Sequence, residues 1–222
     1  MSYSMRDRTS TQAQPIHEPP FVEANGLLSY TEVGREPEFL DASFETILFG
    51  ERVMVDHLVM LFSNALALAQ YGDRLIQYGA RAIEGPGIWP QEFCSGLTSF
   101  PDDLTMYFLS VLMPSGGILV LAAPHTPNDQ LDRFLQERGL NAVHHVALRT
   151  EDINTAAELW QRKGFVPVSV APQDDGCLCQ WPFRNSTGQI IELIHRRCEG
   201  GATFSCQNIA ALRLTEVEKI KD

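Results

Sequence analysis

The chain has 222 residues, of which 44% are hydrophobic and 20% are charged, and its formal net charge is −11. This length supplies one large domain or two small ones with a self-sufficient core, and the composition is typical of a globular protein. The negative charge disfavours nucleic acid as a partner, because phosphate backbones are repelled. No apolar window of about 18 residues is present, so we expect no membrane span.

The N-terminal region is polar and lacks the apolar stretch of a secretory signal, so we expect a cytoplasmic protein. The five cysteines are an odd number, which predicts reduced thiols in the cytosol. Cys177 and Cys179 lack zinc-site spacing and are interpreted as packing residues. Residues 1–25 resemble a disordered arm, and residues 1–50 are assigned to a partly disordered N-terminal arm with a short strand within 27–33.

After residue 50, apolar runs typical of strands alternate with amphipathic runs typical of helices. Gly and Pro at 84–87 predict a loop. The expected strands are 52–62, 104–114, 116–124, 141–150, 165–170, 177–183 and 188–196, with QEFCSGL (91–97) as the candidate for one more. The expected helices are 65–80, 128–140 and 152–163.

The order strand–helix–strand–strand–strand therefore occurs twice, at about 53–124 and 142–196, which indicates an internal duplication. We predict an α+β fold in which two βαβββ modules form one cupped mixed sheet with helices outside. The first module is assigned to 51–127 and the second to 128–222.

Each module opens with a strand that carries a central histidine, His57 in the first and His145 in the second. Side chains alternate between the two faces of a strand, so both histidines can point into the cup while His144 faces the helices. On this alternation the residues that share the cup with them are Val55, Val59, Val143 and Ala147.

Glu192 lies within the apolar run IIELI of the last strand, where an unpaired carboxylate is costly to bury. A metal ion held by His57, His145 and Glu192 would offset that cost. A lone histidine in an apolar strand is more often a hydrogen-bonded core residue, but two at matching positions of a duplicated unit favour the metal site. The first-module position that matches Glu192 falls near Val120 or Leu121, and neither side chain can ligate.

Three protein ligands leave three open positions on an octahedral metal, which suits Fe(II) with a bidentate substrate and O2. A structural zinc site would instead be closed by a fourth ligand. The sequence thus predicts a metalloenzyme centre.

Residues from about Asp56 to Glu218 resemble the catalytic C-terminal half of 4-hydroxyphenylpyruvate dioxygenase, of the vicinal oxygen chelate superfamily. The matching motifs are Val55-Asp56-His57, NAVHHVALRTEDI (141–153) and GQIIELIHRR (188–197), in the family's order. The resemblance implies that His57, His145 and Glu192 bind Fe(II), and that Gln180 contacts the substrate. It also implies oxidative decarboxylation of a 2-oxo acid coupled to hydroxylation of the same molecule, with a C-terminal helix at about 207–219 closing the pocket.

Several pocket positions depart from the family pattern. Pro182 stands where the family has Phe, with Phe183 one place later, and Ala122 replaces a polar residue. Ile209 replaces an aromatic residue that would flank the substrate ring. A smaller or more aliphatic 2-oxo acid than 4-hydroxyphenylpyruvate would fit these changes.

Two other functions stay open at this point. One is a non-redox isomerase, epimerase or lyase of the same superfamily that uses another divalent metal as a Lewis acid. The other is a binding module for a drug or metabolite. Pairing into a homo-oligomer is also left open.

Overall fold

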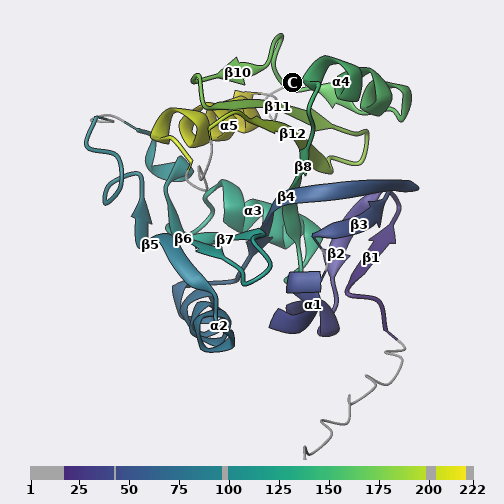
Figure 1. The fold of residues 1–222 in the computed structure, drawn as a ribbon. Helices are drawn as coiled ribbons and strands as arrows, with labels where there is room; N and C mark the ends of the chain where they lie inside the picture. The colour runs from purple at the N-terminus through teal and green to yellow at the C-terminus, as the bar shows by residue number, and fades with distance from the viewer. Residues whose placement is uncertain (1–17, 43, 97–99, 199–203, 219–222) are drawn as a thin grey trace, which may run out of the picture.

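The computed structural model describes residues 18–42, 44–96, 100–198 and 204–218 (Figure 1). The large sheet comprises β3 (Glu45–Leu48), β4 (Glu51–Leu61), β5 (Arg81–Trp89), β6 (Met106–Leu112), β7 (Ile118–Pro124), β8 (Val143–Arg149), β9 (Val166–Pro167), β10 (Gln173–Asp174), β11 (Leu178–Arg184) and β12 (Ile190–Arg196). A separate hairpin comprises β1 (Phe21–Ala24) and β2 (Leu27–Tyr30). The helices are α1 (Pro37–Ala42), α2 (Ala65–Tyr78), α3 (Gln130–Arg138), α4 (Ile153–Arg162) and α5 (Cys206–Glu218), with short 3-10 turns η1 (Val33–Arg35) and η2 (Asp102–Leu104).

The sheet consists of two equivalent halves that meet where β4 pairs antiparallel with β8. The first half has the order β4-β7-β6-β5, and the second has β8-β12-β11, with β9 and β10 pairing with the outer edge of β11. The pairs β4–β7 and β8–β12 are both parallel. The prediction of an α+β fold built from two βαβββ modules is confirmed.

The helices of the two modules begin and end at the residue types that local chemistry favours. Asn64 caps α2 by accepting a hydrogen bond from the backbone N–H of Ala67, and α2 ends at Gly79, whose φ of 117° is left-handed. Asp152 caps α4 in the same way. The buried face of α2 packs against β6 and β7, and α4 packs against β11 and β12. Among the described residues, none of the helices is both long and apolar enough to cross a bilayer.

Alternation along the strands creates two apolar layers, one on each face of the sheet. The layer beneath the helices includes Leu58, Met60, Leu119, Leu121, Leu193 and Trp160. The layer inside the cup includes Val59, Leu61, Met106, Phe108, Val120, Ala122 and Leu131. The candidate site therefore lies on the cup face, opposite the helices of the modules.

Two register shifts interrupt this alternation and correct part of the prediction. Val55 pairs with Leu148 while His57 pairs with Ala147, so Asp56 is an extra residue on β4. The equivalent shift on β8 leaves His144 as the extra residue there. A bulge turns the following residues to the other face. Val55 and Val143, expected in the cup, consequently lie in the layer beneath the helices.

Within the predicted arm 1–50, the described residues form β1, β2, η1, α1 and β3. The β1–β2 hairpin contacts the second module, because the backbone N–H of Leu28 donates to Oε1 of Gln189 at 2.7 Å and Ser29 bridges to Ala142. Strand β3 pairs with the beginning of β4. The remainder of the predicted arm, residues 1–17, lies outside the described residues.

The second strand of the first module does not lie at the predicted position, 91–97. It is β5, which contains the predicted loop 84–87, and register shifts between Ala82 and Gly87 accommodate the Gly and Pro residues. Residues 91–96 of the candidate QEFCSGL instead form turns.

Candidate metal centre

Three side chains from three neighbouring strands meet on the cup face. His57 lies on β4, His145 on β8 and Glu192 on β12, and β8 is paired with both of the other strands. Nε2 of His57 is 3.3 Å from Nε2 of His145 and 3.4 Å from Oε2 of Glu192. Nε2 of His145 is 3.7 Å from the same carboxylate oxygen. All three residues are buried. The structure thus brings together the three residues predicted to bind a metal.

The chemistry of these atoms fits a cation. Burial lowers the pKa of His57, although Asp56 opposes the shift, and burial with the nearby charges of His144, His57 and Arg213 lowers the pKa of His145 well below its ordinary value. Nδ1 of His57 faces the Asp56 carboxylate at 3.1 Å and so carries the proton of a neutral ring. Its Nε2 then presents a lone pair to Glu192, which is also an acceptor. A divalent metal ion between them would satisfy both groups.

Each candidate ligand histidine is contacted by the residue that precedes it in the chain. Oδ1 of Asp56 is 3.1 Å from Nδ1 of His57, and Nδ1 of His144 is 2.9 Å from Nδ1 of His145. Both preceding residues are the bulge residues of their strands. A bond to the distal ring nitrogen fixes the tautomer and the orientation of a metal-binding imidazole. The bulges therefore supply this support at equivalent places in the two modules.

Asp56 is fully buried and is held by two arginines, one on β8 and one on β12. Nε of Arg196 donates to it at 2.8 Å, and Nη2 of Arg149 donates at 3.1 Å. Burial alone would raise the pKa of Asp56, but the hydrogen bonds from His57 and Arg196 and the positive charge of Arg196 hold that pKa well below its ordinary value. The anionic form is thus favoured. The sequence alone assigns no role to Asp56 or to either arginine, because their contacts join residues from three strands.

Strand register identifies the position that corresponds to Glu192 in the first module. His145 pairs with Ile190 on β12, and His57 pairs with Ile118 on β7. Glu192 is two residues beyond Ile190, so its counterpart is Val120. Val120 lines the same cavity and has no ligating atom.

The three side chains open into a cavity with a free volume of about 50 Å³. This is room for only a few water molecules. The wall is mostly apolar and includes the two altered positions Ala122 and Ile209. Phe183, by contrast, is buried beneath the helices and does not line the cavity. Gln180 lines it, and its Nε2 donates to the backbone carbonyl of Asn208 at 3.2 Å.

Helix α5 forms one side of the cavity through Asn208, Ile209, Leu212 and Arg213. Phe204, just before α5, packs its ring edge to face against His57, with ring centres 4.7 Å apart. The predicted position of the C-terminal helix, about 207–219, agrees with that of α5.

Two disulfides flank the entry into this helix and correct the expectation of reduced thiols. Cys206, the first residue of α5, is bonded to Cys94, and Cys198 is bonded to Cys177. Cys179 is buried and free. Pairing partners that are 112 residues apart, as in the first disulfide, leave no local sequence signal.

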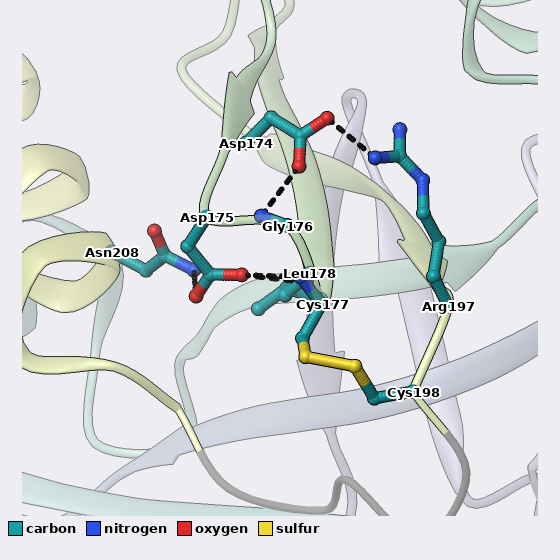
Figure 2. The surroundings of a disulfide bond; sticks show 8 residues. All are labelled: Asp174, Asp175, Gly176, Cys177, Leu178, Arg197, Cys198 and Asn208. Carbon is teal, nitrogen blue, oxygen red and sulfur yellow. Dashed lines mark hydrogen bonds and ion pairs between the residues drawn. A yellow bond between two sulfur atoms is a disulfide. The ribbon is translucent and has the colours of Figure 1, made fainter.

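The turn that holds the second disulfide also contacts α5 (Figure 2). Asp175 accepts hydrogen bonds from the backbone N–H groups of Cys177 and Leu178, at 3.0 and 2.7 Å. Its other carboxylate oxygen accepts from Nδ2 of Asn208 on α5, at 3.1 Å. Asp174 in the same turn pairs with Arg197. Helix α5 is thus fastened to the second module as well as to Cys94.

Comparisons with known proteins give matches among solved structures. No sequence family matches the chain, and no curated protein is similar to it in sequence. Among solved structures, a variant of 4-hydroxymandelate synthase from Streptomyces coelicolor aligns with a TM-score of 0.53 at 20% identity, over 80% of this chain and 58% of that chain. Methylmalonyl-CoA epimerase from Mycobacterium tuberculosis aligns with a TM-score of 0.46 at 18% identity, over 71% of this chain and 97% of that chain.

The paired modules and the cupped sheet define a vicinal oxygen chelate fold, and the predicted resemblance to 4-hydroxyphenylpyruvate dioxygenase is confirmed at the level of the fold. Within this fold, His57, His145 and Glu192 form a group that could hold a metal ion.

Proposed function

We propose that the protein is an Fe(II)- and O2-dependent dioxygenase or hydroxylase that acts on a 2-oxo acid or a similar bidentate small molecule, with a pocket altered from that of 4-hydroxyphenylpyruvate dioxygenase. The observation that carries this proposal is that the position equivalent to Glu192 in the first module offers no fourth ligand. Two imidazoles and one carboxylate converge, and the position that would complete a fourth ligand is Val120. When bound, Fe(II) would supply a centre that accepts the two vicinal oxygens of a 2-oxo acid and O2 at the remaining positions.

The residues of the chain have separate roles in this proposal. His57 and His145 would each offer the metal a lone pair from a neutral ring, and Glu192 would contribute the single negative charge of the ligand group. Asp56 keeps the proton of His57 on Nδ1, so that Nε2 stays available to the metal. The apolar wall excludes bulk water, which protects a reactive centre from side reactions. Gln180, together with Asn208, lies where it can orient the substrate.

The test is a reconstitution under argon, followed by addition of 2-oxo acids and then O2. We expect one Fe(II) per chain, a weak visible charge-transfer band with a bound 2-oxo acid, and O2 uptake that consumes this acid. Glu192→Ala should lose the metal and both signals. The matched control is Glu158→Ala, which removes a carboxylate that is 75% exposed on α4.

Other outcomes separate the competing functions. Turnover with Zn(II) under argon, with no O2 uptake with Fe(II), would replace the proposal by a non-redox isomerase, epimerase or lyase. A reconstituted protein without stoichiometric metal would instead favour a binding module.

A further inference from the structure

A second cavity adjoins the one at the candidate metal ligands. It lies between α3, Arg184 at the end of β11, Gly188 in the turn that follows, and Ile190 at the start of β12. Its free volume is about 140 Å³, compared with about 50 Å³ at the metal ligands. The two cavities share one lining residue, His144, and none of the three candidate ligands lines the second cavity. The second cavity is therefore a separate site.

The charge of this second cavity is opposite to that of the whole chain. Three arginines line it, Arg133 and Arg138 from α3 and Arg184 from β11, whereas Glu137 is the one carboxylate among its lining residues. Three positive charges and one negative charge leave a formal excess of two positive charges, in a chain whose net charge is −11. A concave wall of one sign concentrates ions of the opposite sign, so the second cavity attracts anions.

The guanidinium group of Arg138 is held in place by neutral groups. It lies over the ring of Phe134, 5.5 Å from the ring centre. It also passes directly over Gly188, where an added Cβ would collide with its Nη2. A glycine at this turn thus lets the arginine approach the backbone closely. These contacts position the positive charge without neutralising it.

The other two arginines are likewise not neutralised. Nη1 of Arg133 donates to the backbone carbonyl of Asn128 at 2.8 Å. Nε of Arg184 is buried and has no hydrogen-bond partner among the described residues. Over the described ranges, none of the three arginines is joined to a carboxylate by an ion pair. A buried guanidinium N–H without a partner is costly, and an anion in the second cavity would remove that cost.

We propose that the second cavity binds a phosphate group, either as the free ion or on a small molecule. A phosphate monoester carries about two negative charges at neutral pH and three acceptor oxygens, which matches the formal excess of two positive charges. Guanidinium groups bind such oxygens through paired, charge-assisted hydrogen bonds. A carboxylate offers one charge and two oxygens, so it would satisfy fewer of the three arginines. The free volume is roughly ten times what one water molecule needs, which is enough for a phosphate.

The test titrates inorganic phosphate and acetate into the full chain by calorimetry. Ionic strength is held constant, because salt screens exposed charges. We expect phosphate to bind about 10- to 100-fold more tightly than acetate, as for added hydrogen bonds between charged groups. Glycerol phosphate distinguishes the two sources of the group. A dissociation constant equal to or below that of inorganic phosphate indicates an ester, and a higher one indicates the free ion; either supports the site.

The same titration on metal-free and Zn(II)-loaded protein separates this site from the metal centre. Because the arginines do not belong to the ligand group, we expect equal phosphate affinity in both forms. Phosphate binding that occurs only in the metal-loaded form would place the ion at the metal and overturn the proposal.

Variants assign the binding to the arginines. Arg184→Met should weaken phosphate binding about 10- to 100-fold, and Arg133→Met should weaken it less, because Arg133 is exposed. The matched control is Arg162→Met, which removes an arginine whose side chain is 68% exposed on α4, and it should keep the wild-type affinity. Circular dichroism verifies that each variant is folded.

Two results would overturn the proposal directly. One is equal binding of phosphate and acetate to the wild-type protein, which decides the matter even if Arg184→Met fails to fold. The other is an unchanged dissociation constant for phosphate in folded Arg184→Met.

Discussion

Replacing Asp56 by asparagine should weaken metal binding without changing any ligand. Asparagine has nearly the same shape but no charge, and its amide group cannot accept hydrogen bonds from both arginines and from His57. The proton on Nδ1 of His57 is then less firmly fixed, and the ring is less well oriented. Loss of such an outer partner typically lowers metal affinity about 10- to 100-fold, which corresponds to about 1.4 to 2.8 kcal/mol.

The same substitution should also destabilise the fold. Asp56 is fully buried, and the side chain of Arg196 is only 13% exposed, so Asp56→Asn leaves a partly buried charge without its anion. Breaking such a pair costs about 3 kcal/mol. The pKa of Asp56 is lowered in the folded state, so its contribution is present above its ordinary value of 3.8 and is lost as the pH falls below it. The variant should lack this part of the acid sensitivity.

The assay is a chelator competition with Zn(II) or Co(II), combined with urea unfolding of the metal-free protein at several pH values. Arg149→Gln is the control, because this arginine also contacts Asp56 but its side chain is 47% exposed. It should cost less than about 1 kcal/mol and leave metal affinity unchanged. A folded Asp56→Asn protein with wild-type metal affinity would refute the assigned role of Asp56.

Four further measurements test the structure more widely. Burial raises the pKa of Tyr30 to about 12. The protonated side chain therefore contributes its full share of stability below pH 10.0, the ordinary pKa, and this share is lost as the pH rises through 12. Urea unfolding should show that the free energy of unfolding falls by up to about 2 kcal/mol over this range, and Tyr30→Phe should reduce that fall. The buried hydroxyl of Tyr71 has no hydrogen-bond partner among the described residues, so Tyr71→Phe should unfold at an equal or higher urea concentration. A thiol reagent under denaturing, non-reducing conditions should add one label per chain, at Cys179, by intact mass; five labels would exclude the disulfides. Removing the disulfide between Cys94 and Cys206 should lower the free energy of unfolding by about 4 kcal/mol. An unchanged urea midpoint would argue against a stabilising role of this disulfide.

The three candidate ligands could be predicted from the sequence because their signals are local or repeated. His57 and the pair His144–His145 lie at the same place in a duplicated unit, where the family resemblance singles out His145, and Glu192 is a charge inside an apolar strand. The groups that orient them could not be predicted in the same way. A bulge is defined by pairing between two strands, so the single chain does not show that Asp56 and His144 leave the regular ladder.

Longer-range features were missed for a related reason. The packing of residues 18–50 depends on contacts such as Leu28 with Gln189, which are far apart in the chain. The polar composition of the N-terminus indicated an arm because composition does not report such contacts. Gly85 and Pro86 indicated a loop, yet β5 accommodates them through irregular pairing with β6. The odd number of cysteines led to the expectation of reduced thiols, but an odd number does not reveal that four of the five cysteines form disulfides.

The Cys94–Cys206 disulfide would keep the first residue of α5 joined to Cys94 in any state in which the helix leaves the cavity. The contacts of the helix with the cavity wall, which include hydrogen bonds of Asn208 and Arg213, are noncovalent, whereas Cys206 is covalently joined to Cys94. Re-closure is then an intramolecular event, and a short tether gives an effective concentration of about millimolar or higher. Local opening therefore has a high return rate, independent of protein concentration. In these terms the disulfide limits how long the cavity stays open, while the noncovalent contacts set how often it opens.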